Sequence, residues 1–337
     1  MTKILQNKPI AVIGAGAFGT SMAKLLSENG HETLIFSREK KVVDEINNKH
    51  SNEIFLPGAK LANNLIAVND SELINQCTVL VNVVPTQYIT SLYKSYNFDL
   101  NDKIIVNCSK GIETSSLLLI QDIFSKELGI DPEKYVDLTG PSHAEEVMRR
   151  LPTTVVAACK NHTLAVAIQE LFSNNFFRVY SREDVVGAEL GGALKNIIAI
   201  AAGVADGLGL GDNTKAALLT RGLAEIKRLG VALGAKGETF AGLSGLGDLF
   251  VTSSSKLSRN RSVGEQIGKG ITLKEIQSST HTIAEGVFTC KAAYDLSKRE
   301  NVEMPITEQM YKVLYEEKPI KDAICNLMSR DYRPEWE

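Results

Sequence analysis

Three glycines, Gly14, Gly16 and Gly19, lie between an apolar run at residues 10–13 and a helix-like segment at residues 20–29. A strand, a G-x-G-x-x-G turn and a helix in this order are typical of dinucleotide-binding folds. The first glycine permits the tight turn, the second lets a pyrophosphate approach the backbone, and the third lets the helix pack against the strand. Because the N–H groups at the start of the helix would face the anion, this context favours dinucleotide binding over a glycine-rich turn without a ligand.

The next apolar run, residues 33–36, ends where a cofactor ribose would lie. Sites that prefer NAD usually carry an acidic residue there, about 20 residues after the glycines, and it binds the ribose hydroxyls. Here Ser37 and Arg38 hold that place, and Glu39 comes one residue later. Arg38 is either an ordinary surface arginine or the partner of a 2′-phosphate. We therefore expect NADPH or NADH as the cofactor, with NADP weakly favoured.

Strand-like and helix-like segments alternate through the first half of the chain. Helix-like segments include residues 20–29, 115–128 and 163–172. The strand-like runs are residues 10–13, 33–36, 79–84, 104–108, 136–138, 154–158 and 176–180. The strongest of them are continuous apolar runs, as expected for strands that are covered on both faces. The alternation predicts an α/β fold with a Rossmann-type, doubly wound, mostly parallel sheet.

The strand signal stops near residue 185, and the rest of the chain is typical of helices joined by turns rich in glycine or serine. The expected helices are residues 187–203, 214–229, 287–298 and 307–314. We therefore expect an all-helical C-terminal domain after the sheet. The predicted limits are a dinucleotide-binding Rossmann domain over 1–190, a helical substrate-binding domain over 191–328 and a loose tail over 329–337.

Composition and charge argue against several functional classes. The net charge of −3 disfavours nucleic acid as the main partner, since phosphate-backbone binding needs a dense basic face. Five scattered cysteines without a C-x-x-C pair argue against a disulfide framework or a metal site, and they fit a reducing compartment. No apolar stretch is expected to reach the roughly 18 residues of a membrane span. We expect a cytoplasmic protein, without a metal, that acts on a small molecule.

Lys195 is the first candidate for proton transfer, which a hydride transfer to a carbonyl requires. Its neighbours three and four residues away on a helix are Gly191, Gly192, Ile198 and Ala199. That face is small and apolar, so the lysine either reaches out to solvent or points at an anionic group. In the second case burial lowers its pKa and a nearby acid raises it. The protonated amine would donate to a developing alkoxide, and the reverse oxidation would need the neutral amine.

Other polar residues fall near the expected ligand crevice. Lys110, in "VNCSKGIE", follows a strand at the sheet edge where ligands bind, or is an exposed turn lysine. The loop "SSSKLSRNRS" carries Lys256, Arg259 and Arg261, and it is either solvated or a phosphate clamp, for which the planar fork of arginine is suited. Asp248, in "GLGDL", is expected to cap a helix, with orientation of a substrate group as the alternative.

The histidines offer weaker candidates. His143, in "TGPSHAEE", follows a strand, yet we favour a structural role for it over catalysis. A surface role is expected for His31, which follows a helix-ending glycine, and for His50 and His162, which lie in polar loops.

Ten motifs recur in order over nearly the whole chain: "GAGAFGT", "VVP", "SKGIE", "GPSHAEE", "FRVYS", "ELGGALKNIIAIAAG", "GLGDL", "SRNR", "AEGV" and "EMPIT". This ordered set resembles the bacterial NAD(P)-dependent glycerol-3-phosphate dehydrogenases, and "LKN" with "GLGDL" and "SRNR" is its most specific part. The resemblance implies a Rossmann domain, a helical domain and a site between them. It also implies reduction of dihydroxyacetone phosphate to sn-glycerol 3-phosphate for phospholipid synthesis, and a homodimer.

The resemblance also implies roles for single residues. Lys195 matches the proton-transferring lysine, and Lys110 matches a residue that contacts both cofactor and substrate. The implied substrate contacts are Lys110, Gly140, Ser142, Lys195, Asp248, Ser258, Arg259 and Asn260. The implied cofactor contacts are Gly14, Gly16, Ala17, Phe18, Gly19, Arg38, Lys110, Ala144, Arg259, Ile283 and Glu285.

The chain departs from this family at a few positions. Ala17 and Phe18 stand where the family often has serine followed by tryptophan or tyrosine, Ser109 stands where threonine is frequent, and Ile283 replaces a common valine. Ala17 lacks a hydroxyl donor, but we expect little effect because backbone N–H groups do most of the anion binding at such a turn. None of these departures touches the inferred chemistry.

Two other functions fit parts of the pattern. One is a two-domain reductase of the β-hydroxyacid or ketopantoate type, whose substrate lacks a phosphate and gives no reason for "SRNR". The other is a nicotinamide-sensing binding protein without turnover, which has no need for both Lys110 and Lys195 in the crevice.

Overall fold

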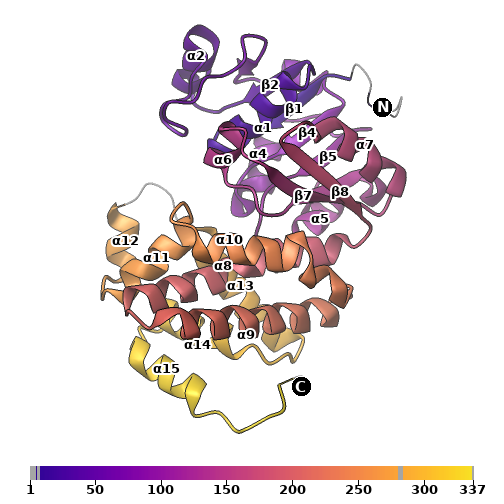
Figure 1. Ribbon diagram of the computed structural model, residues 1–337. Coiled ribbons are helices and arrows are strands. Elements are labelled where there is room, and N and C mark those ends of the chain that lie inside the picture. Colours follow the sequence, from indigo (N-terminus) through magenta and orange to yellow (C-terminus); the bar gives the residue numbers. More distant parts are fainter. Residues whose placement is uncertain (1–4, 6–7, 280–283, 336–337) are drawn as a thin grey trace.

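The computed structural model describes residues 5, 8–279 and 284–335 of the 337 in the chain. A sheet flanked by helices forms the N-terminal part, and a bundle of helices forms the C-terminal part (Figure 1). Figure 1 shows the two parts as separate layers, with helix α8 (Val185–Gly207) next to the sheet.

The sheet has eight strands in the order β3-β2-β1-β4-β5-β6-β7-β8. All neighbouring strands run parallel except β6 and β7, which run antiparallel. The strands are β1 (Ile10–Ile13), β2 (Thr33–Phe36), β3 (Ile66–Val68), β4 (Val79–Asn82), β5 (Ile104–Asn107), β6 (Tyr135–Thr139), β7 (Thr153–Ala158) and β8 (Phe177–Arg182). The predicted doubly wound, mostly parallel sheet is confirmed.

The central strands are buried over their full length, as their continuous apolar sequences predict. Ile13, the last residue of β1, pairs with Phe36 in β2 and with Asn82 in β4. The carboxyl ends of these strands therefore meet at one edge of the sheet, which is where ligands bind in open parallel sheets.

Helices cover the sheet and build the C-terminal bundle. Those of the first part are α1 (Ala17–Glu28), α2 (Lys40–Lys49), α3 (Glu72–Asn75), η1 (Thr86–Tyr88), α4 (Ile89–Ser95), α5 (Ile120–Asp122), η2 (Ile123–Glu127), η3 (Pro132–Lys134), α6 (Ala144–Met148) and α7 (His162–Phe172). Those of the second part are α8 (Val185–Gly207), α9 (Gly211–Ala232), η4 (Gly237–Ala241), η5 (Leu243–Gly247), α10 (Asp248–Ser254), α11 (Arg259–Gly268), α12 (Leu273–Ser279), α13 (Glu285–Arg299), α14 (Pro305–Tyr315) and α15 (Ile320–Met328).

Helix α8 is the core of the bundle. Small residues let α11 approach it closely: a Cβ added at Gly203 would lie 2.0 Å from the Arg261 carbonyl oxygen, and one at Gly264 would lie 1.9 Å from that of Ile200. By length and composition the helix could cross a membrane, whereas the sequence analysis predicted no apolar stretch of that length. However, 94% of its apolar window is buried inside the protein, as in the core helix of a globular domain.

Two details of the sequence prediction differ from the structure. Residues 115–128 were expected to form one helix, but regular structure begins only at α5. The Glu113 carboxylate accepts hydrogen bonds from the N–H groups of Ser115 and Ser116, and Leu117 has a left-handed backbone with φ of 59°. These contacts hold the segment as a turn. The second difference is β3, a three-residue strand that the sequence analysis did not predict because it lacks a strong apolar run.

The predicted domain limits of 1–190, 191–328 and 329–337 stay a prediction. Residue 190 lies inside α8, and α15 ends at Met328. In the tail, the Arg333 side chain pairs with Glu303, and the Arg221 side chain donates to the Glu335 carbonyl oxygen over 2.8 Å.

Candidate active site

The glycine turn joins β1 to α1 with the geometry of a phosphate cradle. Gly14 has a φ of 113°, a backbone conformation that residues with a side chain rarely adopt. A Cβ at Gly19 would lie 1.8 Å from the Gly14 carbonyl oxygen, whereas one at Gly16 would meet nothing within 4 Å. In the described part of the chain no side chain caps the start of α1. The backbone N–H groups of its first turn therefore suit the pyrophosphate of a dinucleotide.

Several predicted cofactor residues gather around this turn. Ala17 and Phe18, at the start of α1, pack against a small apolar cluster of Leu56, Ala59 and Ala144, the last of which begins α6. The Ser21 hydroxyl donates to the Ala144 carbonyl oxygen over 3.1 Å and ties α1 to α6. Arg38 is exposed, two residues after β2, at the carboxyl edge of the sheet.

Lys195 and Lys110 meet at one carboxylate. The Lys195 Nζ lies 2.5 Å from the Asp248 Oδ1 and 2.5 Å from the Thr252 Oγ1. The other oxygen of Asp248 accepts a hydrogen bond from the Lys110 Nζ. Asp248 is 1% exposed and Lys195 is 5% exposed, so the pair is shielded from water. The expected helix-capping role of Asp248 is wrong, because its side chain binds the two lysines and makes no cap bond at α10.

Three different elements bring these side chains together. Lys110 follows β5 at the carboxyl edge of the sheet, Lys195 comes from the middle of α8, and Asp248 begins α10. Glycines on α8 allow the approach: a Cβ at Gly192 would lie 2.9 Å from the Thr139 Oγ1 and 3.5 Å from the Lys110 Cγ. The small face that surrounds Lys195 in the sequence is thus the face on which the sheet and the bundle meet.

The charges of the cluster shift the pKa values of its members. Burial lowers the pKa of Lys195 to about 7, against the opposing attraction of Asp248, and repulsion from Lys110 adds to the effect. Burial alone would raise the pKa of Asp248, but the two lysines together hold it below its usual value. Asp248 is therefore ionised near neutral pH, while Lys195 exchanges its proton in that range.

Gly140 and Ser142 line the same edge. The Gly140 carbonyl oxygen accepts from the Lys110 Nζ over 3.3 Å and from the Ser142 hydroxyl over 3.0 Å. His143 lies beside them, and its Nε2 is enclosed without a hydrogen-bond partner among the described residues. Burial and the nearby Lys195 lower the pKa of His143, so this imidazole is neutral near neutral pH.

Two arginines near the start of α11 differ in exposure: Arg259 is exposed, and Arg261 is paired within the fold. The Ser258 hydroxyl caps the helix by accepting from the Arg261 N–H over 3.2 Å. The Arg261 guanidinium lies 2.6 Å from Asp206 on α8, so it is engaged within the fold. Arg259, the first residue of the helix, is exposed, as is Lys256. An exposed arginine at a helix N-terminus is well placed to bind an anion.

Asn260 and Glu285 connect α11 to neighbouring helices. The Asn260 amide donates to the Asn196 Oδ1 over 3.0 Å and accepts from the Gly286 N–H over 2.9 Å, so both of its ends are used. Burial raises the pKa of Glu285 to about 7, although Arg259 opposes the shift, and its Oε2 is enclosed without a partner among the described residues. The predicted cofactor contact Ile283 lies outside the described residues.

Two family models match most of this chain. The family model described as "NAD-dependent glycerol-3-phosphate dehydrogenase N-terminus" matches residues 9–165, and its C-terminus model matches residues 184–325. This chain belongs to the NAD-dependent glycerol-3-phosphate dehydrogenase family. The glycerol-3-phosphate dehydrogenase [NAD(P)+] of Geobacter sp. (strain M21) is 49% identical over 97% of this chain and 98% of its own length. That of Carboxydothermus hydrogenoformans is 47% identical over 97% and 98%.

The fold of this glycerol-3-phosphate dehydrogenase family member also matches a solved relative. The crystal structure of glycerol-3-phosphate dehydrogenase from Coxiella burnetii superimposes with a TM-score of 0.90 at 36% identity, covering 96% of this chain and 99% of that one. The family resemblance, the Rossmann-type fold with its helical second part, and the use of NAD or NADP are therefore confirmed.

Sequence reasoning missed some polar residues of the site. Thr252 lies one helical turn after Asp248, and that spacing was the only signal for it. Asn82 and Asn107 each end an apolar strand, and Asp137 interrupts a buried one, so an amide or a carboxylate in such runs was a signal for a buried network.

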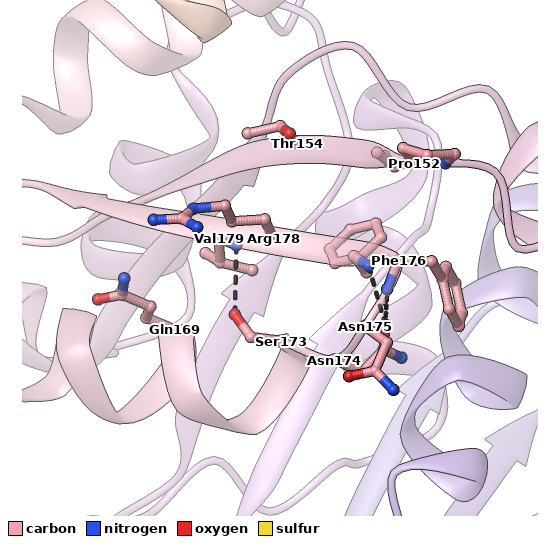
Figure 2. A pocket seen from close by; sticks show the side chains of 11 residues that line it. Pro152, Thr154, Gln169, Ser173, Asn174, Asn175, Phe176, Arg178 and Val179 are labelled. Carbon is pink, nitrogen blue, oxygen red and sulfur yellow. Dashed lines mark hydrogen bonds between the residues drawn. The ribbon is translucent and has the colours of Figure 1, made fainter.

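A separate hollow of about 450 Å³ lies beside β8 (Figure 2). This strand forms the edge of the sheet that lies opposite β3. Its walls come from residues 152–154, 169 and 173–179. The Ser173 hydroxyl accepts from the Val179 N–H over 3.2 Å, and the Asn174 Oδ1 accepts from the N–H groups of Phe176 and Phe177. These bonds shape the turn into β8, and the hollow is apart from the lysine cluster of this glycerol-3-phosphate dehydrogenase family member.

Proposed function

We propose that this chain reduces dihydroxyacetone phosphate to sn-glycerol 3-phosphate with NADH or NADPH, reversibly, and that Lys195 is its proton donor. The observation that carries the proposal is the buried contact of Lys195 and Lys110 with Asp248, at the sheet edge where the glycine turn also lies. A ketone bound there would meet a cation whose proton is exchangeable near neutral pH.

The chain's own residues bind the substrate, orient the amine of Lys195 and transfer the proton. The reduced nicotinamide supplies the hydride when it is bound. The Lys195 Nζ gives its proton to the oxygen of the forming alkoxide, and Asp248 and Thr252 hold the amine in one direction. Lys110 contacts the substrate and the cofactor from the other side of Asp248. Its charge stabilises the negative charge that develops on the oxygen.

The phosphate of the substrate binds at the start of α11. Arg259 supplies the cation, and Ser258 and Asn260 flank it, with Gly140 and Ser142 along the sheet edge. Because binding of the remote phosphate fixes the reacting carbon, much of the rate should come from positioning. Neither a phosphate-free hydroxyacid nor a purely sensing role gives Arg259 and the two lysines this use.

The dinucleotide would lie along the glycine turn. Gly14, Gly16, Ala17, Phe18 and Gly19 would hold the pyrophosphate, and Ala144 and Glu285 are further proposed contacts. Arg38 would face the ribose, and for that reason we propose a weak preference for NADP.

The experiment is to follow consumption of NADH and of NADPH with dihydroxyacetone phosphate, side by side. We expect turnover with both cofactors and a lower KM for NADPH. Binding of the cofactor without oxidation in the presence of this ketone would contradict the proposal. A match of the cofactor KM values would remove only the proposed NADP preference.

Three wider proposals follow from the family resemblance. The chain acts in the cytoplasm, it supplies glycerol 3-phosphate for phospholipid synthesis, and it forms a homodimer. Sedimentation of the purified protein tests the last of these, since a monomeric mass at micromolar concentration would contradict it.

A further inference from the structure

Beneath Lys110, buried polar side chains cross the carboxyl ends of three neighbouring strands. The Tyr93 hydroxyl donates to the Asn82 Oδ1 over 3.3 Å. The Asn82 amide donates to the Asn107 Oδ1 over 2.9 Å, and the Asn107 amide donates to the Asp137 Oδ1 over 2.8 Å. The line therefore runs from α4 through β4 and β5 to β6, and it ends on a carboxylate.

This line also fixes the backbone from which Lys110 extends. The Asn107 Oδ1 accepts from the Ser109 N–H over 3.1 Å, and the Asn107 amide donates to the Ser109 carbonyl oxygen over 2.9 Å. The Ser109 hydroxyl donates to the Val84 carbonyl oxygen over 2.6 Å. Because Ser109 directly precedes Lys110, these bonds set the direction in which the lysine leaves the sheet.

Asp137 is a buried carboxylate with one oxygen that the hydrogen bonds described so far leave unpaired. It is 2% exposed, and its Oδ2 has no hydrogen-bond partner among the described residues. A buried carboxylate with an unpaired oxygen is unfavourable unless a nearby charge compensates it. Lys110 is the cation whose charge acts on Asp137. When Lys195 is protonated, it carries one excess positive charge together with Lys110 and Asp248, and an ionised Asp137 would balance that charge.

We propose that Asp137 is a positioning residue of this site, which orients Lys110 through Asn107 and supplies the second negative charge that balances the two lysines. The inference rests on the proposed function of Lys195 as proton donor. The role of Asp137 follows from its place at the end of the buried line.

Titratable groups from several elements interact with Asp137. Burial raises the pKa values of Cys108 on β5, Tyr135 on β6 and Glu189 on α8, and the charge of Asp137 adds to each rise. The charges that act on Asp137 are that of Lys110, which lowers its pKa, and that of Asp248 on α10, which raises it. Burial raises the pKa of Asp137 to about 7, while the Asn107 hydrogen bond and the Lys110 charge oppose that rise.

The variant Asp137→Asn tests the charge. The amide keeps an oxygen that accepts from Asn107, but it has no negative charge to stabilise the protonated lysines. We expect the alkaline limb of the kcat–pH profile for reduction to move to lower pH by at least about half a unit, with unchanged cofactor Kd. Should this variant fail to fold, Asp137→Ser removes the same charge with a smaller side chain and should move the limb in the same direction.

The matched control is Glu225→Gln, which removes another buried carboxylate whose pKa is raised to about 7 by burial, between α9 and α14. This change should leave the limb in place. A limb that does not move in folded Asp137 variants, or that moves equally in the Glu225 variant, would overturn the inference. If the wild-type chain itself does not reduce dihydroxyacetone phosphate, the proposed function fails and takes this inference with it, so the two failures are distinguishable.

Discussion

The Lys195 Nζ lies 2.5 Å from the Asp248 Oδ1, and both side chains are buried where the sheet meets the helical bundle. The carboxylate holds the amine in one direction, and the surrounding protein makes its charge costly. An amine in this state releases its proton near neutral pH. That property suits a reaction that runs both ways, since reduction needs the protonated amine and oxidation needs the neutral one.

The pH dependence of the two directions should therefore be opposite. Burial lowers the pKa of Lys195 to about 7, so the protonated form is lost as the pH rises through that value. We expect kcat/KM for dihydroxyacetone phosphate to fall above about pH 7 and kcat/KM for glycerol 3-phosphate to rise over the same range. Initial rates in both directions on either side of neutral pH measure this. Profiles that bend in the same direction would assign the titration to another group.

The two arginines of "SRNR" should differ in their effect on the substrate. Arg259→Ala removes an exposed cation at the start of α11, and we expect KM for dihydroxyacetone phosphate to rise by about tenfold to a hundredfold, as for a lost charge-assisted hydrogen bond. Arg261→Ala is the control, because that guanidinium is paired with Asp206 and Glu265. Steady-state kinetics with varied ketone compares them. An unchanged KM in the Arg259 variant would remove this residue from the phosphate clamp.

Two glycine variants separate ligand binding from folding. A Cβ at Gly16 meets no protein atom within 4 Å, so Gly16→Ala should keep the melting temperature and weaken cofactor binding by occupying the space of the pyrophosphate. A Cβ at Gly19 would lie 1.8 Å from the Gly14 carbonyl oxygen, so Gly19→Ala should lower stability as well. Thermal melts and cofactor titration measure both effects. Full cofactor affinity in the Gly16 variant would place the pyrophosphate elsewhere.

Stability should depend on pH through Glu225. This buried carboxylate accepts from the N–H groups of Ile306 and Thr307 at the start of α14, and burial raises its pKa from 4.5 to about 7. A raised pKa in the folded state means that its contribution to stability is full below pH 4.5 and is lost as the pH rises through 7. The loss amounts to about 3 kcal/mol. Urea unfolding of wild type and Glu225→Gln at pH 5 and pH 8 tests this, and an equal pH dependence in both proteins would contradict it.

Long, continuous apolar segments made the sheet predictable. The bounds of β1 and β2 match the sequence prediction because four buried residues in a row, ended by glycine or polar residues, leave little choice. Strand β3 was missed because it has three residues and its first, Ile66, is half exposed. The segment at 115–128 was wrongly expected to be one helix, since side-chain bonds from Glu113 outweigh local helix preference there.

The site was predictable only in part, because its contacts join distant residues. The small apolar face around Lys195 indicated a groove, but its partner Asp248 lies 53 residues further along the chain. Only the family resemblance connected the two, and from its own sequence context Asp248 was expected to cap a helix. The link between Asn107 and Asp137 spans 30 residues and two strands, so it depends on the order of the strands in the sheet.

The central claim is that Lys195 provides the proton, and the variant Lys195→Met tests it most directly. Methionine keeps the apolar length of the side chain and removes the amine. The measurement is kcat for reduction of dihydroxyacetone phosphate together with the Kd of the cofactor. We predict a loss of about a hundredfold to ten-thousandfold in kcat, as expected for removal of a general acid, with cofactor Kd unchanged. A variant that keeps kcat within tenfold of the wild type would show that another group provides the proton.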